Sequence, residues 1–252
     1  MKTPHFYAII IGSEILNGRR HDKHFDFIRD ALLARGHTLF STFIIKDDPN
    51  LIRAIFTLIK NDPEAVLFSF GGIGSTPDDL TRALASEVFD DGHLIAHPQF
   101  YDDIIARYAN KAFPHRIFMS HLPKKAHLLP NVVNNMSGFY LENRYFFMPG
   151  FPEMAHPMVT YALEHFYPVA PQTYRMTLRA HESENDLMHI MTRLDPHVDF
   201  SSLPMLNHGN PYVDISVASM DERLCQESFN LFVEDLTQRG IGFEVLEETI
   251  LP

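Results

Sequence analysis

The chain has little of what a secreted, membrane-bound or nucleic-acid-binding protein needs. It has one cysteine, Cys225, which excludes a disulfide within its 252 residues and predicts a reducing, cytoplasmic environment. No apolar run approaches membrane-spanning length, and the N-terminal segment lacks the apolar core of a secretory signal. The formal net charge of −11 argues against a nucleic-acid or anionic-membrane partner, because both bind basic surfaces. We therefore expect a soluble, cytoplasmic protein.

The common signatures of nucleophilic and zinc-dependent catalysis are also missing. The sequence has no Gly-x-Ser-x-Gly motif and no His-Glu-x-x-His string. Among its 15 histidines, the pairs His21 and His24, and His93 and His97, have spacings that could share a helical face. Neither pair belongs to a tight cluster of further ligands. We therefore interpret most histidines as surface or capping residues and do not predict a histidine zinc site.

The most informative feature that is present is a glycine-rich string from Gly71 to Thr81, GGIGSTPDDLT, directly after the apolar run 65–70. Three glycines at the end of a buried strand let the backbone turn tightly and bring N–H groups close to a ligand. Pro77 suits the first turn of a helix, and a helix N-terminus attracts phosphate. The carboxylates of Asp78 and Asp79 favour that helix end or a bound cation. The string predicts a phosphate-bearing ligand with a metal ion, whereas a plain strand–turn–helix would account for the glycines alone.

Short β-rich runs alternate with amphipathic segments over residues 1–168. The alternation predicts an α/β domain around a mostly parallel sheet, with ligands at the carboxyl ends of the strands. A proline-rich segment at 167–172 is interpreted as a linker to a small α+β domain at 173–252. The expected strands are 6–11, 38–45, 65–70, 127–129, a hairpin over 139–147, 173–178, 198–200, 212–217 and 242–246; the expected helices are 22–35, 50–60, 80–89, 98–109, a run ending near 166, 184–194 and 222–239.

Several segments, in the same order along the chain, resemble the competence/damage-inducible protein A (CinA) family of the molybdenum-cofactor-biosynthesis, or molybdopterin-binding, superfamily. The glycine string resembles the superfamily signature, and GSEILNG at 12–18 resembles the family's Gly-Thr/Ser-Glu-Leu-Leu-x-Gly. Lys46-Asp47-Asp48 falls where the family has an aspartate, and 137–139 and 148–153 resemble its later Pro-Gly and Leu-Pro-Gly-Pro-Pro-x-Glu segments. The match covers residues 5–166, and residues 173–246 are similar to the KH-like module that follows in that family.

The resemblance implies a three-layer sandwich of the molybdopterin-binding type with a KH-like second domain. It implies divalent-metal-dependent cleavage of ADP-ribose-type pyrophosphates, with Mg²⁺, Mn²⁺ or Co²⁺ and with potassium as a further candidate ion. The wider superfamily instead binds molybdopterin, and its habit implies a homo-oligomer, a dimer or trimer. Full-length relatives carry a C-terminal nicotinamide-nucleotide amidase domain, so amidase activity is not expected of these residues. The KH-like part lacks a Gly-x-x-Gly loop, so we interpret it as an interaction element.

The same resemblance implies the site residues. Asp79, two residues before the motif threonine, is expected to be the catalytic or metal-binding carboxylate, with Asp47 and Glu14 converging on it. Helix capping is an equal alternative for Asp78, and Glu14 could simply start a helix. The other predicted phosphate- or nucleotide-binding residues are Gly12, Ser13, Gly71, Gly72, Gly74, Ser75, Thr76, Thr81, Ser137, Gly138, Pro149 and Gly150.

Three departures from the family bear on activity. Ile73 replaces a usual Thr, Ser75 replaces a usual Pro, and the basic segment 19–24 (RRHDKH) replaces an Asn-containing stretch. That basic segment could clamp phosphate or form a solvated face. Three hypotheses follow: a metal-dependent nucleotide pyrophosphatase, a molybdopterin-binding or adenylyl-transfer protein, and a nucleotide-binding regulator without turnover.

Overall fold

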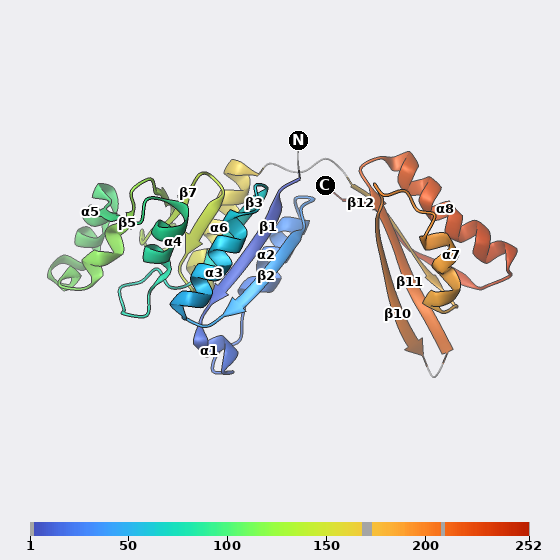
Figure 1. Ribbon diagram of the computed structural model, residues 1–252, viewed down its shortest axis with the longest axis horizontal. Coiled ribbons are helices and arrows are strands. Elements are labelled where there is room, and N and C mark those ends of the chain that lie inside the picture. The colour runs from blue at the N-terminus through green and yellow to red at the C-terminus, as the bar shows by residue number, and fades with distance from the viewer. Residues whose placement is uncertain (1–2, 168–172, 208–209, 252) are drawn as a thin grey trace. The chain divides into compact units, whose positions relative to one another are not determined.

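The structure, a computed structural model, describes residues 3–167, 173–207 and 210–251. The chain separates into two compact units, Met1–Leu33 with His37–Pro168 and Ala34–Gly36 with Val169–Pro252 (Figure 1). The segment predicted as a linker, 167–172, lies outside the described residues except for Tyr167.

A six-stranded mixed sheet forms the centre of the first unit, in the order β2-β1-β3-β8-β7-β6. β1 pairs in parallel with β2 and β3, and β3 pairs in parallel with β8, whereas β7 is antiparallel to both of its neighbours. The predicted α/β class with a mostly parallel sheet is confirmed. The strands are β1 (His5–Ile11), β2 (Leu39–Ile45), β3 (Ala65–Phe70), β6 (His127–Leu129), β7 (Gly138–Leu141) and β8 (Tyr145–Met148).

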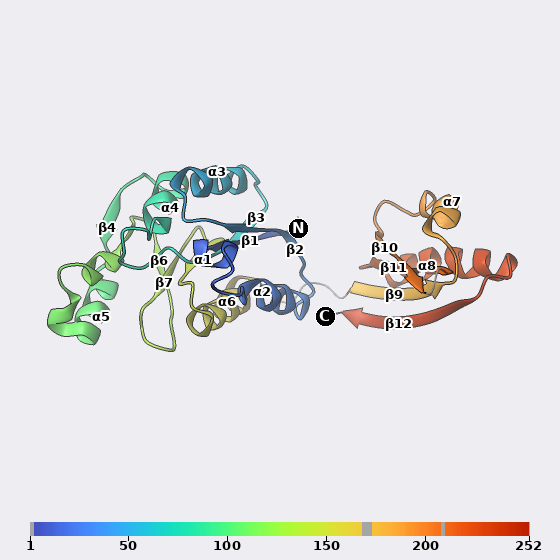
Figure 2. The ribbon, with the colours of Figure 1, turned by 90° about the horizontal axis from the view of Figure 1, so that it is seen from below.

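Helices cover both faces of this sheet, which makes a three-layer arrangement (Figure 2). β1 and β3 are nearly continuous apolar runs because both of their faces are buried. On one face, Ile9 and Leu67 share a core with α3 and α4; on the other, Ile10 and Phe68 share a core with α2 and α6. The helices are α2 (His24–Leu33), α3 (Pro49–Lys60), α4 (Thr81–Phe89) and α6 (Pro152–Phe166).

Several short elements of the first unit have no counterpart in the sequence prediction. β4 and β5 pair antiparallel as a separate two-stranded sheet, and α1 is a single helical turn directly after β1. These elements contain too few residues to show a hydrophobic period, although the equally short β6 is predicted, at 127–129. These elements are α1 (Ser13–Leu16), β4 (Leu94–Ala96), η1 (Ala109–Ala112), η2 (Arg116–Ser120) and β5 (His121–Pro123), and the predicted helix α5 (Pro98–Tyr108) lies among them.

The second unit is built on an antiparallel sheet in the order β10-β11-β9-β12. Its core joins the buried face of β9 and β11 to α8, through residues such as Leu178, Ile215 and Phe232. The helix predicted at 184–194 is wrong in length, because only η3 and the four-residue α7 form there. The elements are β9 (Thr173–Ala180), η3 (Glu184–Leu187), α7 (Met188–Met191), β10 (Asp199–Asn207), β11 (Asn210–Ser219), α8 (Glu222–Gln238) and β12 (Phe243–Leu251).

β10 is also longer than the predicted strand 198–200. Leu203 on this strand is exposed and is followed by Pro204, so the apolar alternation that signals a strand stops early. The pairing with β11 nevertheless continues to Asn207. Backbone hydrogen bonding to a neighbouring strand, which composition does not report, determines its length.

The longest described helix, α8, has 17 residues with charged side chains along its length. Within the described part of the chain, no helix combines the length and apolar character that crossing a bilayer requires. Cys225 lies buried on α8, with its Sγ 3.3 Å from the carbonyl oxygen of Tyr174, and burial raises the pKa of its thiol. Cys225 is therefore a small side chain packed in the core of the second unit.

Candidate functional site

Three loops, which follow β1, β3 and β8, meet at the carboxyl ends of the parallel strands. The Gly71 N–H donates a hydrogen bond to the Met148 carbonyl oxygen at 2.9 Å, and a Cβ atom on Gly150 would lie 3.5 Å from the Gly71 Cα. The Gly12 N–H donates to the carbonyl oxygen of Ile45 at 3.0 Å, which ties the first loop to the end of β2. The loops after β1 and β3 therefore share one edge of the sheet, as βαβ connections require.

The glycines that open the loop after β3 have conformations and neighbours that exclude a side chain. Gly71 has φ +102° and Gly72 has φ +70°, which L-residues with a side chain rarely adopt. A Cβ atom on Gly71 would also overlap the carbonyl oxygen of Ile11, and one on Gly72 would overlap the hydroxyl of Thr81. The loop can follow this path only with glycine at both positions.

The first two residues of α4, Thr81 and Arg82, donate hydrogen bonds to three carbonyl groups of the glycine loop. The Thr81 hydroxyl donates to the Gly71 carbonyl oxygen at 2.9 Å, and the Thr81 N–H donates to that of Gly72 at 2.9 Å. Nη2 of Arg82 donates to the carbonyl oxygen of Gly74 at 2.6 Å. In a trans peptide the N–H points opposite to the C=O, so the N–H groups of the next residues are turned away from α4.

The N–H groups turned outward belong to Gly72, Ile73 and Ser75. Among the hydrogen bonds of the described residues, none engages these three N–H groups, although the neighbouring carbonyls are bonded. The residues are partly accessible to solvent. Neighbouring backbone N–H groups of a turn that have no acceptor in the protein can bind an anion. We call these three N–H groups the phosphate cradle.

Two of the predicted phosphate-binding groups take other roles. The N–H of Gly71 is already bonded to Met148, so it does not contribute to the cradle. Thr81 is fully buried, and its hydroxyl supports the loop instead of facing a ligand. The physical reason is that the turn is tight: its inner carbonyls need donors, and Thr81 supplies both a hydroxyl and an N–H.

The helix after the loop begins later than Pro77, at Thr81, which corrects the placement of Pro77 in its first turn. Residues 76–79 instead form a turn closed by the Asp79 N–H donating to the Thr76 carbonyl oxygen at 3.0 Å. Oδ2 of Asp79 accepts from the Thr76 N–H at 2.8 Å and lies 2.7 Å from its hydroxyl. The same hydroxyl lowers the pKa of Asp78. The Asp79 carboxylate lies against Gly74, where a Cβ atom would be 2.5 Å from Oδ2, and so borders the cradle.

Asp47 is bonded to Ser13 and joins the loops after β1 and β2. Its Oδ2 accepts from the Ser13 N–H at 2.9 Å and from the Ser13 hydroxyl at 2.8 Å. The carboxylate therefore closes the turn that begins α1. Ser13 is predicted to bind a ligand, but in the structure both its N–H and its hydroxyl are hydrogen-bonded to Asp47.

The three carboxylates predicted to hold a metal ion do not converge. Within residues 3–167, 173–207 and 210–251, no group of three or more His, Cys, Asp or Glu side chains is placed to hold a metal. Asp79 is held by Thr76 and Asp47 by Ser13, while Glu14 lies 3.7 Å from Nη1 of Arg20. A cation site made by the protein alone does not fit this arrangement. Single carboxylates remain, of which Asp79 borders the cradle.

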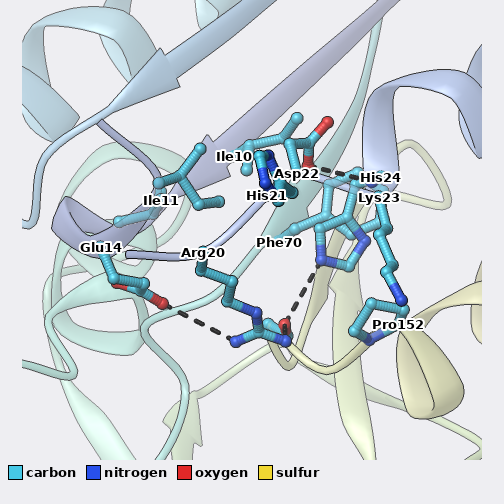
Figure 3. A pocket seen from close by; sticks show the side chains of 12 residues that line it. Ile10, Ile11, Glu14, Arg20, His21, Asp22, Lys23, His24, Phe70 and Pro152 are labelled. Carbon is cyan, nitrogen blue, oxygen red and sulfur yellow. Dashed lines mark hydrogen bonds and ion pairs between the residues drawn. The ribbon is translucent and has the colours of Figure 1, made fainter. Parts of the chain in front are cut away.

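A pocket opens at the same edge, between the loop after β1, the start of α2 and the loop after β8 (Figure 3). Nη2 of Arg20 donates to the Gly150 carbonyl oxygen at 3.1 Å, and its Cζ lies over the ring of Phe151, 5.6 Å from the ring centroid. The basic segment 19–24 is therefore partly a pocket wall and not only a solvated face. The lining residues are Ile10, Ile11, Glu14, Ile15, Arg20, His21, Asp22, Lys23, His24, Phe70, Gly150 and Pro152.

His24 is an exception to the interpretation of most histidines as surface or capping residues. It is 3% exposed and stacks on Phe70 with ring centroids 4.3 Å apart, and its Nε2 lies 3.4 Å from the carbonyl oxygen of Gly150. Burial lowers its pKa to about 4, so the imidazole is neutral at neutral pH. The signal that would have found it is the spacing of His24, Ile28 and Leu32, which places all three on the buried face of α2.

The residues predicted to bind a ligand just before β7 and just after β8 divide between packing and the site. Gly138 begins β7, where a Cβ atom would lie 2.5 Å from the carbonyl oxygen of Phe147, so glycine is required there for packing. Ser137 immediately precedes that strand. Pro149 and Gly150 form the loop after β8, and Gly150 lines the pocket.

Arg82 is a site residue that the sequence reading missed. It is 8% exposed, and besides Gly74 it donates to the carbonyl oxygens of Phe118 and His121. Its signal in the sequence is a cation in the first turn of a helix, where the helix dipole disfavours positive charge. In this structure, the arginine at that position contacts the glycine loop through the Gly74 carbonyl oxygen.

Comparison with known proteins agrees with this geometry. Residues 7–168 match the family model described as "Probable molybdopterin binding domain". A CinA-like protein of Acaryochloris marina is 29% identical over 158 residues, which cover 60% of this chain and 37% of that protein. A CinA-like protein of a Cyanothece species is 23% identical over 233 residues, covering 85% of this chain and 54% of that protein. The chain thus matches about a third to a half of the length of these relatives.

The fold has a similar solved structure. The protein CinA of unknown function from Thermoplasma acidophilum superposes with a TM-score of 0.56 at 24% identity, covering 64% of this chain and 96% of that one. The family model covers more than half of the chain and includes the cradle and the pocket. The chain therefore belongs to the probable molybdopterin-binding domain family and is similar to CinA-like proteins.

Proposed function

We propose that the first unit binds a small phosphate-bearing nucleotide and hydrolyses its pyrophosphate, with an ADP-ribose-type compound as substrate. The observation that carries the proposal is the phosphate cradle, in which the N–H groups of Gly72, Ile73 and Ser75 face outward without an acceptor. Such groups bind a phosphate through direct hydrogen bonds and do not depend on the net charge of the protein.

The adjoining pocket supports a ligand larger than a single phosphate. Gly150 lines the pocket and lies beside Gly71, so the pocket borders the glycine loop. Its wall combines cationic donors, Arg20 and Lys23, with the carboxylate acceptors Glu14 and Asp22. Donors and acceptors side by side suit a sugar with hydroxyl groups as well as a second anionic group.

The charge of Asp79 beside the cradle supports a role for a divalent ion that enters with the ligand. Magnesium is commonly bound through one or two carboxylates together with substrate phosphates, so a preformed cage is not needed. Asp79 uses Oδ2 for Thr76, and no bond of its Oδ1 is found in the described chain. When bound, such an ion would neutralise phosphoryl charge and activate water.

Ile73 does not weaken the cradle in the way its replacement of Thr first suggests. Its side chain packs against the hydrophobic core, while its backbone N–H belongs to the cradle. The missing hydroxyl therefore leaves the N–H groups available. This favours a working site over a decayed one.

The alternative ligand is a pterin phosphate, the class of ligand that the description of the family model names. The same cradle would hold its phosphate, and the pocket would hold the rest of the molecule. This reading predicts tight binding of molybdopterin, with dependence on ATP if the protein transfers an adenylyl group.

The test is incubation of the purified chain with ADP-ribose and Mg²⁺, Mn²⁺ or Co²⁺, with and without potassium, while AMP release is followed by chromatography. Metal-dependent AMP release that is lost in Asp79→Asn and kept in the neighbouring Asp78→Asn supports hydrolysis. Undiminished turnover in Asp79→Asn removes this carboxylate from the mechanism. A thermal shift with ADP-ribose but no AMP supports a regulator, and the absence of both directs the search to the pterin.

A further inference from the structure

Arg82 carries a buried positive charge directly beneath the phosphate cradle. Its guanidinium donates to carbonyl oxygens of three segments: Gly74 of the glycine loop, Phe118 of η2 and His121 of β5. All three partners are uncharged. No ion pair between Arg82 and a carboxylate is found in the described chain, and its Nε is buried without a hydrogen-bond partner.

A charge in this position is costly to the fold on its own. Removing a guanidinium from water costs free energy that a paired carboxylate normally offsets. Burial lowers the pKa of Arg82, and the more distant charge of Asp79 offsets this effect only in part. A glutamine amide is neutral but has two N–H donors for these three carbonyls, so the hydrogen bonds account for the fork of an arginine but not for its charge.

The position of Arg82 relative to the cradle does account for it. The Gly74 carbonyl accepts from Nη2 at 2.6 Å, and the Ser75 N–H of the same peptide unit points the opposite way, into the cradle. The guanidinium therefore orients this peptide unit and increases the positive potential on its outward side. An anion at the cradle would face that potential through a single peptide unit.

We propose that Arg82 is a positioning residue for the cradle and that its charge sets a preference for doubly charged phosphate monoesters, such as the AMP that the proposed hydrolysis releases, over singly charged diesters, such as each phosphate of ADP-ribose. The inference rests on the proposed function, because it assumes that the cradle binds phosphate. Arg82 acts through the Gly74–Ser75 peptide unit and does not touch the ligand.

Two ligands and three variants test this. The dissociation constants of adenosine 5′-monophosphate and of its methyl ester, which carries one charge less, are measured by calorimetry at equal salt above the second phosphate pKa of about 6. The wild type is expected to prefer the monoester. In Arg82→Gln the ratio of the two constants falls about tenfold, whereas Arg82→Lys, which keeps the charge, retains it. Arg144→Gln is the matched control, since Arg144 also donates to a carbonyl, that of Pro63, but belongs to the opposite end of the sheet.

Each outcome decides between the claims. If Arg82→Gln weakens both ligands by the same factor, Arg82 is a structural support and the proposal is wrong. If Arg82→Lys folds but loses the preference, the planar guanidinium matters and the positive charge does not, which also overturns the proposal. The Arg82→Lys variant alone provides this test if Arg82→Gln does not fold. If the wild type binds neither ligand, the cradle itself is not a phosphate site and the proposed function fails. A wild type that binds both ligands equally leaves phosphate binding standing and overturns only the preference assigned to Arg82.

Discussion

The hydroxyl of Thr81 donates a hydrogen bond to the carbonyl oxygen of Gly71, 2.9 Å away, and so joins the first residue of α4 to the end of β3 across the glycine loop. Both groups are buried, so the bond is protected from water. It engages a carbonyl on the side of the loop that faces α4, whereas the N–H groups of the cradle lie on the opposite side. The relationship explains why a threonine ends the motif although it does not face a ligand.

Thr81→Val is therefore expected to lower the free energy of unfolding by about 2 kcal/mol, because the Gly71 carbonyl loses its buried donor while the side-chain volume is kept. Urea unfolding measures the change. Thr57→Val is the control, since the Thr57 hydroxyl donates to Arg53 on an exposed helix face and its loss should change stability by less than about 0.5 kcal/mol. Equal effects of the two variants would contradict the role given to Thr81.

Gly71→Ala should destabilise the protein much more than Gly18→Ala. Both glycines have positive φ, +102° and +76°, so each alanine carries the conformational cost of about 1 kcal/mol. Only the alanine at 71 also overlaps backbone, at the carbonyl oxygen of Ile11, whereas nothing lies within 4 Å of a Cβ on Gly18. We expect an additional cost of about 2 kcal/mol or more for Gly71→Ala in thermal or urea unfolding. Similar stabilities of the two variants would show that the loop shifts without penalty.

Stability should fall as the pH is lowered from 6.5 towards 4, in part because of His24. Burial lowers its pKa from 6.5 to about 4, so the unfolded chain binds a proton in this range that the folded protein does not. The contribution of neutral, buried His24 is complete above pH 6.5, and about 3 kcal/mol of it is lost once the pH has fallen through the folded-state pKa. His156, beside it, adds to the effect because burial also lowers its pKa.

His24→Phe removes the titrating group and keeps an aromatic ring against Phe70. Urea unfolding at a series of pH values should give a flatter dependence for this variant than for the wild type. His197→Asn is the control, because the His197 side chain is 87% exposed and should leave the slope nearly unchanged. An unchanged slope in His24→Phe would mean that His24 titrates normally.

Ser13 and Asp47 should be energetically coupled. Asp47 accepts both the N–H and the hydroxyl of Ser13, and the Asp47 N–H donates to that hydroxyl at 3.4 Å, so Ser13→Ala removes both contacts of the hydroxyl and Asp47→Ala removes both contacts of the carboxylate. A double-mutant cycle measured by urea unfolding should give a coupling of about 1 kcal/mol. Additive effects would indicate that the hydroxyl contact contributes nothing to the loop.

The first unit shows how far sequence patterns reach. The apolar runs of β1 and β3 and the amphipathic spacing of α3 are long enough to have a period, and the structure has each of them in place. The short β4 and β5 and the single turn of α1 have no period, and pairing with distant segments creates them. In the second unit, β10 extends beyond its apolar residues for the same reason, because β11 pairs with it.

The site likewise has features that the local sequence determines and features that tertiary contacts determine. The sequence by itself determined that glycines 71, 72 and 74 follow a buried strand and that loops after parallel strands gather at one edge, because these properties are local or follow from strand order. Only the tertiary structure decided which groups face outward: Thr81 and Arg82 bond the inner carbonyls, Met148 takes the Gly71 N–H, and Thr76 and Ser13 hold the carboxylates apart. Hydrogen bonds between segments distant in sequence set these orientations, and residue type alone does not specify them.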